Sequence, residues 1–208
     1  MQFTKASFGD AEDVLKKKDK AITDIQHVLQ DLNTTIMWHG QAQLNGDIAN
    51  LFGRRGGWDP QVDSLLKSEA GKDDAGAKSV DFRNVAERVD VEIEFGNVGS
   101  FYRDIFKLNI AKKANQIDVG VIIVGNKEIA GTVGENIASF ERFNDELSIS
   151  WKHGANADCP VMVYGLLPLS YPSNTSLIDP RAKQAKEELM KKRVEKKTLT
   201  SSDQEKLH

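Results

Sequence analysis

The chain has 208 residues, of which 28% are charged and 39% hydrophobic, and its net charge is −3. This length suits one domain with a substantial core, and the slightly acidic balance argues against a protein that coats nucleic acid without specificity. The single cysteine, Cys159, excludes an internal disulfide framework and a multi-cysteine zinc site.

The N-terminal part, residues 1–78, is predicted to be helical and loop-like. Its first twenty residues lack the apolar segment of a signal peptide, and no stretch of the sequence is long and apolar enough to span a membrane. We therefore expect a cytoplasmic protein with no membrane partner. Apolar side chains recur at helical spacing over residues 10–33, with Asp10 as the N-cap. Shorter helices are predicted over residues 47–52 and 60–68.

The pattern changes at residue 79, where strands begin to dominate. The order of elements predicts a single α/β domain over residues 1–208, built on a central mixed β-sheet flanked by helices. Residues 79–170 form its core, in which we expect Cys159 to be a small buried residue. The predicted elements are strands over 79–82, 88–96, 117–125 and 158–167, a helix over 100–115, and a basic helix over 180–198.

Basic residues are concentrated in two stretches. Residues 181–197 hold eight basic and three acidic side chains, a local charge of +5, and residues 103–113 have a local charge of +3. Such runs most often form a solvated helix face. The alternatives are a surface that binds DNA or one that contacts an acidic protein partner.

The stretch "VDVEIEFGN", residues 89–97, alternates apolar residues with Asp90, Glu92 and Glu94. A strand places these three carboxylates on one face, about 7 Å apart. Either all three lie in water, where screening weakens their repulsion, or some of them face a divalent cation, which reverses the sign of the interaction.

Two neighbouring features favour the cation. Asp81 ends the preceding strand, so a hairpin would bring it beside Glu92, and hard oxygen ligands of this kind suit magnesium. The helix that follows "FGN" carries Arg103 and Lys107. A metal, a carboxylate that activates water, and Arg or Asn side chains that read bases are the parts of phosphodiester hydrolysis at a DNA site.

Asp81 followed by Glu92-Ile93-Glu94 resembles the PD-(D/E)xK nuclease core, in the variant with glutamate where lysine is usual. The stretch "VEIEFGNVGSFYRDIFKL" and the following "IDVGVIIV", "SFERFNDELSIS" and "VMVYGL" are similar, in order and spacing, to restriction endonucleases of the BamHI, BglII and BstYI group. The resemblance covers roughly residues 79–190, whereas residues 1–78 match poorly. It implies a type II restriction endonuclease with the restriction-endonuclease-like fold.

The resemblance also implies a catalytic site. Asp81, Glu92 and Glu94 are its catalytic residues, and Glu94 takes the place of the usual lysine as the general base. Asp81, Glu92 and the Ile93 carbonyl are the implied ligands of Mg²⁺, for which Mn²⁺ could substitute. Asp90 has no catalytic counterpart and is expected to be solvated or paired. The family's further acidic ligand has no secure match, with Asp63 and Glu69 as alternatives.

The implied DNA-binding residues are Asn97, Ser100, Arg103, Glu135 and Asn136. Glu135 and Asn136 stand where BamHI has an Asp-Arg pair, so we expect a palindrome built on GATC with different flanking bases. The implied partners are double-stranded DNA, a second copy of the chain, and a DNA methyltransferase that protects the host. The alternatives are a repair or recombination nuclease, a non-catalytic DNA-binding module, and a protein-interaction domain.

Overall fold

The structure, a computed structural model, describes residues 3–32, 41–63, 79–133, 136–153 and 158–168. These residues lie within one compact unit, residues 1–169. The predicted basic helix over 180–198 and the basic stretch 181–197 lie outside the described residues. Six strands form one sheet in the order β1-β6-β5-β4-β3-β2. The strands are β1 Phe3–Phe8, β2 Asp59–Asp63, β3 Ser79–Asn84, β4 Val89–Glu94, β5 Val119–Gly125 and β6 Val161–Leu166.

The sheet is mixed, as the sequence predicted. Strands β4, β5 and β6 run parallel, while β1 pairs antiparallel with β6, and β2 and β3 continue antiparallel from β4. All seven residues of β5 are buried, so the strand predicted over 117–125 is a central strand covered on both faces.

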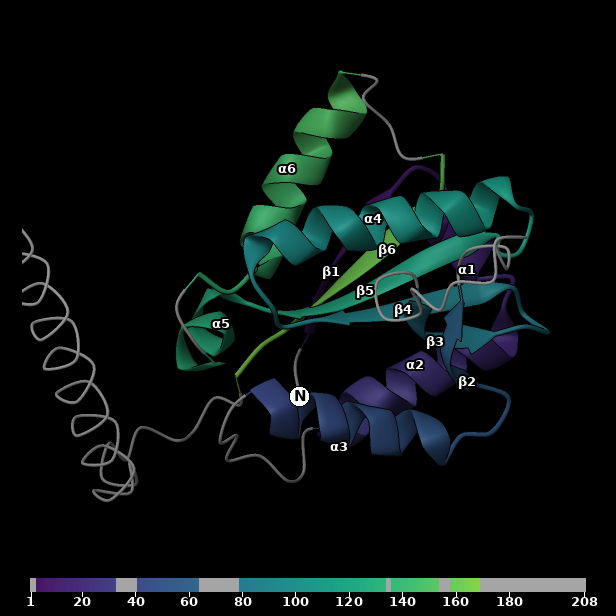
Figure 1. Cartoon of the computed structure of the whole chain (residues 1–208), viewed down its shortest axis with the longest axis horizontal. Coiled ribbons are helices and arrows are strands. Elements are labelled where there is room, and N and C mark those ends of the chain that lie inside the picture. The colour runs from purple at the N-terminus through teal and green to yellow at the C-terminus, as the bar shows by residue number, and fades with distance from the viewer. Residues whose placement is uncertain (1–2, 33–40, 64–78, 134–135, 154–157, 169–208) are drawn as a thin grey trace, which may run out of the picture. The chain divides into compact units, whose positions relative to one another are not determined.

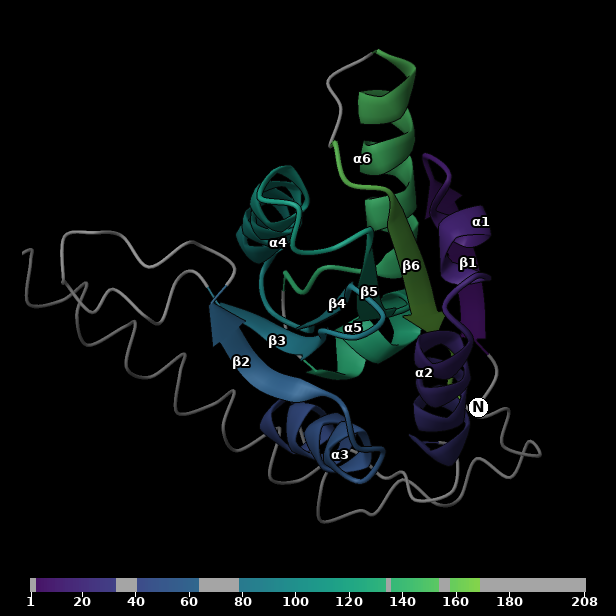
Figure 2. The same ribbon diagram turned by 90° about the vertical axis from the view of Figure 1, so that its right-hand side faces the viewer.

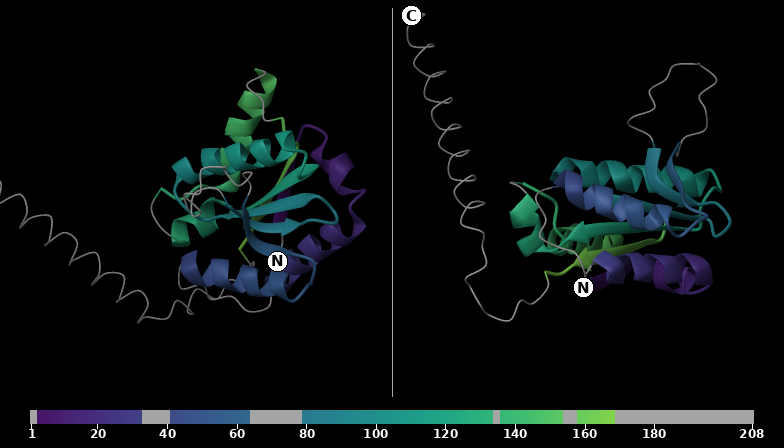
Figure 3. Two further views of the ribbon diagram at one scale, coloured as in Figure 1. Left: turned by 45° about the vertical axis from the view of Figure 1, so that its right-hand side comes forward. Right: turned by 90° about the horizontal axis from the view of Figure 1, so that it is seen from below.

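Helices cover both faces of this sheet, as Figures 1, 2 and 3 show. The helices α2 (Asp19–Asp31) and α3 (Gln41–Gly53) cover one face, and α4 (Val98–Lys113) and α6 (Phe140–Lys152) cover the other. The remaining helices are α1 (Ala11–Leu15) and α5 (Lys127–Val133). Among the described residues, no helix is long and apolar enough to cross a membrane.

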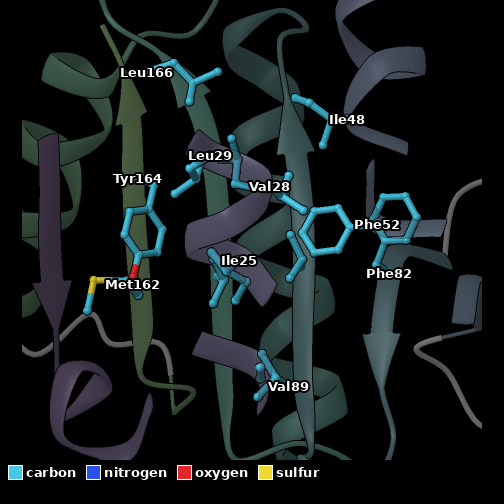
Figure 4. Close-up of a cluster of buried hydrophobic side chains, with 14 of the residues drawn as sticks. Ile25, Val28, Leu29, Ile48, Phe52, Phe82, Val89, Met162, Tyr164 and Leu166 are labelled. Carbon is cyan, nitrogen blue, oxygen red and sulfur yellow. The ribbon is translucent and has the colours of Figure 1, made fainter. Parts of the chain in front are cut away.

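The alternation of side chains along the strands divides the core into two clusters. Ile25, Val28 and Phe52 from α2 and α3 pack against odd-numbered residues of β4 and β5 and against Tyr164 of β6 (Figure 4). On the other face, α4 and α6 cover Ile122, Val124, Val161 and Val163. Cys159 lies in this second cluster, fully buried and free, and burial raises the pKa of its thiol to about 12.

Helix α4 lies very close to the sheet. A side chain at Gly120 in β5 would come within 2.6 Å of Leu108 on α4, so the glycine permits this close approach. Helix α4 confirms the helix predicted over 100–115, although it begins two residues earlier, at Val98. The close packing brings Asp104 and Lys107 of α4 into contact with Glu92 and Glu94 of β4.

The helix predicted over 60–68 is wrong where the structure describes it. Residues 59–63 form strand β2, and residues 64–68 lie outside the described residues. Proline at the start of an apolar stretch suits the first turn of a helix, but it also suits an edge strand. Strand β2 is the edge of the sheet, and Pro60 pairs there with Phe82.

The N-terminal half also differs from the prediction. The helix expected over 10–33 is interrupted after Leu15, because Lys18 leaves helical geometry and its ammonium contacts Asp118 at 2.7 Å. Asp10 is the N-cap residue of α1 but makes no cap hydrogen bond with its side chain. The helix predicted over 47–52 extends over 41–53. Strand β1 and helices α5 and α6 were not among the predicted elements.

Candidate active site

The β3–β4 hairpin brings Asp81 beside Glu92, as the sequence predicted. Phe82 pairs with Val91 and Arg83 with Asp90, so one further step along this antiparallel register sets Asp81 opposite Glu92. The carboxylate of Asp81 is fixed by the backbone of β4, because its Oδ2 accepts a hydrogen bond from the Ile93 amide at 2.7 Å.

The three acidic residues of β4 are buried beneath α4 rather than solvated. Their exposed fractions are 0% for Asp90, 2% for Glu92 and 4% for Glu94. Asp90 accepts two hydrogen bonds from the guanidinium of Arg83, at 2.6 and 2.7 Å. The expectation of a paired acid at this position is confirmed, and a solvated one is excluded. The bidentate pair compensates a charge that burial would otherwise make costly.

Glu92 and Asp104, an acidic residue of α4, both contact the ammonium group of Lys107. Lys107 Nζ lies 2.6 Å from Glu92 Oε1 and 2.8 Å from Asp104 Oδ1, and it donates a hydrogen bond to the Ser79 carbonyl at 3.1 Å. Both Asp104 and Lys107 are on α4 and both are buried. The sequence reasoning placed Lys107 near the site but gave Asp104 no role. Their spacing of three residues, directly after the acidic strand, is the signal that could have found the pair.

Glu94 folds back onto the chain that follows it. Its Oε1 accepts a hydrogen bond from the Gly96 amide, and its carboxyl group is hydrogen-bonded to Asp104. A side chain at Gly96 would come within 2.6 Å of Glu94 Oε1, so only glycine leaves room for this conformation. The proximity of Asp104 disfavours the ionised form of Glu94 in the absence of a cation.

Burial is the main influence on the acidities of this cluster. It raises the pKa of Glu92 to about 9, with the negative charges of Asp104 and Asp81 adding to the effect and Lys107 opposing it. Burial and the hydrogen bond to Asp104 raise the pKa of Glu94 to about 8. The pKa of Asp81 is raised by burial as well, although the Ile93 amide and Lys107 oppose it. Full ionisation of these carboxyl groups is therefore disfavoured, and a bound cation would favour it.

The oxygen donors suit a hard divalent cation, and one of them has no hydrogen bond. Glu92 Oε1 is buried and in ionic contact with Lys107, but no donor aligns with it. Within the described ranges, no three carboxylate, histidine or cysteine side chains converge closely enough to hold a metal ion as they stand. The reason is visible in the geometry, since Lys107 lies between Glu92 and Asp104 and Glu94 is turned toward Gly96.

The residues expected to read DNA lie just beyond this cluster. Asn97 is the N-cap of α4, and its Oδ1 accepts a hydrogen bond from the Gly99 amide at 2.8 Å. An isolated bridge pairs Asn97 with Ile137, which sets exposed Asn136 next to the same segment. Arg103 is exposed and Ser100 half-buried on the first turns of α4. Glu135 lies outside the described residues, as does Glu69.

A cleft of about 560 Å³ reaches the cluster from the other side. Its walls include Asn45 and Asn50 of α3, Trp58, Asp81 and Ile93. The proposed further ligand Asp63 pairs with Ser79 in the β2–β3 ladder, which places its backbone near this hairpin. Asp81 lines this cleft and is half-buried, whereas the three acids of β4 are buried.

Residues 3–166 match a protein-family model described as restriction endonuclease BglII/BglIII. This chain belongs to the BglII/BglIII family of restriction endonucleases. The match covers most of the chain and confirms the family predicted from the sequence. No individual curated protein sequence matches the chain.

Among solved structures, the crystal structure of restriction endonuclease BglII complexed with a DNA 16-mer is similar. The TM-score is 0.66 at 16% sequence identity, and the match covers 81% of this chain and 79% of that one. The likeness shows that the two chains share a fold, which confirms the predicted restriction-endonuclease-like sheet. Membership in the BglII/BglIII family makes the chain a nuclease of the type II restriction class, a hydrolase that acts on DNA.

Proposed function

We propose that this chain cleaves double-stranded DNA at a short palindromic site, by attack of water assisted by Mg²⁺ or Mn²⁺. The observation that carries the proposal is the placement of Asp81 opposite Glu92 in the β3–β4 hairpin, with Glu94 two residues further along β4 and Asp104 of α4 acting on both glutamates. Buried carboxylates with a surplus of negative charge are what a divalent cation requires. Within a restriction endonuclease family, the same cluster is the natural place for hydrolysis.

Each residue of the cluster has a role in the proposed reaction. Asp81 and Glu92 hold the ion, with the Ile93 carbonyl as a third ligand. The bound ion would supply Lewis acidity toward the scissile phosphate and acidify a water molecule. Glu94 accepts a proton from the attacking water, since it is the last residue of β4, next to the segment that leads to α4 and its DNA-reading residues. Arg83 and Asp90 hold β3 and β4 in register beneath them.

The start of α4 and the segment at residue 136 form the base-reading surface. Because the Oδ1 of Asn97 already accepts from the Gly99 amide, its Nδ2 group remains to donate to an acceptor in the major groove. Arg103 suits guanine and Asn136 suits adenine. With Ser100 and Glu135, these residues would read a palindrome built on GATC, with flanking bases that differ from those of GGATCC.

A palindromic site requires two-fold symmetry, so the active species would be a homodimer. Exposed Tyr102 and Phe106 of α4 and Ile149 of α6 support this, because they are large apolar side chains on two helices joined by the Tyr102–Glu146 hydrogen bond. The enzyme would act in the cytoplasm beside a DNA methyltransferase that protects the host's own sites.

A digest of DNA of known sequence tests the reaction and the site together. In the presence of Mg²⁺ we expect discrete fragments, and sequencing of their ends should place the cuts at GATC. A smear would indicate a nuclease without a fixed site, such as a repair enzyme, and binding without cleavage would indicate a DNA-binding module. Cuts clustered at sites without GATC would mean that the resemblance extends to the chemistry but not to the specificity.

The metal ligands are tested by Glu92→Gln. We expect this variant to keep DNA affinity within about tenfold of the wild type while cleavage falls by about 10² or more, because a neutral amide is a poorer ligand and stabilises less charge at the phosphate. Binding is measured by gel shift and cleavage by single-turnover digestion. Glu87→Gln, in the turn between β3 and β4, is the matched control and should cut at the wild-type rate. Wild-type cleavage by E92Q would exclude Glu92 as a ligand.

A further inference from the structure

The ammonium group of Lys107 occupies a position that a metal ion bound by Glu92 would need. Its Nζ lies close to three oxygens: 2.6 Å from Glu92 Oε1, 2.8 Å from Asp104 Oδ1, and 3.1 Å from the Ser79 carbonyl, to which it donates a hydrogen bond. Lys107 is only 7% exposed. A buried lysine with two carboxylates in ionic contact is a resident counter-ion rather than a solvated surface charge.

We infer that Lys107 is an internal competitor of the metal ion: it pairs with both Glu92 and Asp104 when no metal is bound, and it releases Glu92 and keeps Asp104 when the metal arrives. This inference rests on the proposed function, since it assumes that Glu92 is a metal ligand. It adds a positioning role for Lys107 and Asp104, neither of which contacts the reacting atoms.

The geometry allows Lys107 to release Glu92 without leaving the site. If Glu92 turns to a cation, Lys107 loses one acceptor but retains two, the carboxylate of Asp104 and the carbonyl of Ser79. Asp104 lies one turn before Lys107 on α4, so the two can remain paired without any movement of the helix. The Glu92 oxygen nearest the ammonium has no aligned hydrogen bond, so releasing Glu92 breaks an ion pair without also breaking a hydrogen bond at that oxygen.

The charge balance gives the sign of the effect. Two cations that share one carboxylate repel each other, so the ammonium lowers the affinity of the site for a divalent ion. Asp104 weakens this competition because it offers the ammonium another partner. Removing Lys107 should therefore strengthen metal binding, and removing the carboxylate of Asp104 should weaken it by leaving Lys107 bound to Glu92.

The test is a titration of the full-length chain with Mn²⁺, with the free ion followed by electron paramagnetic resonance and no DNA present. We expect Lys107→Met to bind Mn²⁺ about tenfold more tightly than the wild type, the lower end of what partners of metal ligands typically contribute. Lys113→Met is the matched control, because Lys113 is on the same helix and is paired with Asp158 at 2.8 Å. It removes the same charge far from Glu92 and should leave the Mn²⁺ affinity unchanged.

Asp104→Asn separates the proposed role of Asp104 from that of a direct ligand. The substitution should weaken Mn²⁺ binding several-fold in the wild type and lose most of that effect in the K107M background, because no ammonium is left to redirect. An equal loss in both backgrounds would show that Asp104 itself binds the ion, and would overturn its role as the alternative partner of Lys107.

Lys107→Arg covers the case in which K107M does not fold. The guanidinium retains the charge and can bind Glu92 and Asp104 together, so the Mn²⁺ affinity should fall below that of the wild type. An affinity that rises in K107R, or that stays equal or falls in K107M, overturns the inference while leaving the proposed function intact. A wild-type chain that binds no Mn²⁺ and does not cut DNA overturns both.

Discussion

At the scale of single residues, Gly96 leaves room for the carboxylate of Glu94 because it has no side chain. A Cβ atom at Gly96 would lie only 2.6 Å from Glu94 Oε1, which is too close for both atoms to keep these positions. We expect Gly96→Ala to displace this carboxylate and to reduce cleavage by about 10- to 100-fold, since a shift of about 1 Å in a reacting group has effects of this size. Single-turnover digestion measures the loss.

The stability of G96A should remain within about 1 kcal/mol of the wild type, because the displaced group is the end of a flexible side chain. Gly131→Ala in α5 is the control, since a side chain there meets nothing within 4 Å. The control should cut normally and be as stable as the wild type or slightly more stable. A G96A variant with wild-type cleavage would show that Glu94 acts from another conformation.

The same scale shows how far the site could be predicted. Strand periodicity was sufficient to predict that Glu92 and Glu94 lie on one face. The predicted hairpin was sufficient to place Asp81 beside Glu92. The burial of these acids could not be read from the sequence, because it depends on how closely α4 packs on β5 at Gly120. For the same reason Lys107 was predicted only to lie near the site and Asp104 was given no role, although Lys107 contacts Glu92 and both residues are buried.

At the scale of elements, a group of ion pairs joins the start of β5 to the break between α1 and α2. Asp118 is 2.7 Å from Lys18 and 3.1 Å from Arg88. Burial alone would raise the pKa of Asp118, but hydrogen bonds and charges from Lys18 and Arg88 outweigh it and lower the pKa. Because the folded pKa lies below the unfolded one, the stabilisation is complete above the ordinary range of Asp and is lost as the pH falls through the folded pKa.

We therefore expect Asp118→Asn to reduce the free energy of unfolding by about 1 kcal/mol at pH 7, as befits a partly exposed network of charges. The difference from the wild type should shrink as the pH is lowered toward 3. Urea denaturation at several pH values measures it. Asp145→Asn, which alters an exposed acid of α6, should have no comparable effect. A D118N difference that grew on acidification would contradict the sign of this linkage.

The elements themselves were predicted unevenly, and the reason is burial. Strands β3, β4, β5 and β6 have apolar or alternating patterns that only a sheet explains, and all four were found. Strands β1 and β2 lie at the two edges of the sheet, where pairing on one side is enough and the composition is freer. The proline of β2 then favoured a helix, although an edge position accepts it equally well.

At the scale of the whole molecule, the prediction concerns the homodimer. Among the described residues, the large hydrophobic side chains that are most exposed are Val85 at 60%, Tyr102 at 58%, Phe106 at 63% and Ile149 at 61%. Three of the four lie on α4 and α6, and the Tyr102 hydroxyl donates a hydrogen bond to Glu146, one turn before Ile149. An apolar surface made by two neighbouring helices is suited to contact the same surface on a second copy.

We expect Phe106→Asp to prevent dimer formation, because it would bury an unpaired carboxylate in the contact between the two copies. Sedimentation equilibrium should show a dimer for the wild type and a monomer for F106D, and F106D should lose cleavage of both strands at a palindromic site. Val85→Asp is the matched control, since Val85 is equally exposed but lies in the turn between β3 and β4, outside the two helices. It should remain a dimer and cut normally. If F106D sediments like the wild type, or if the wild type forms a complex of one chain per cleaved site, the second copy must contact another surface or be absent from the reaction.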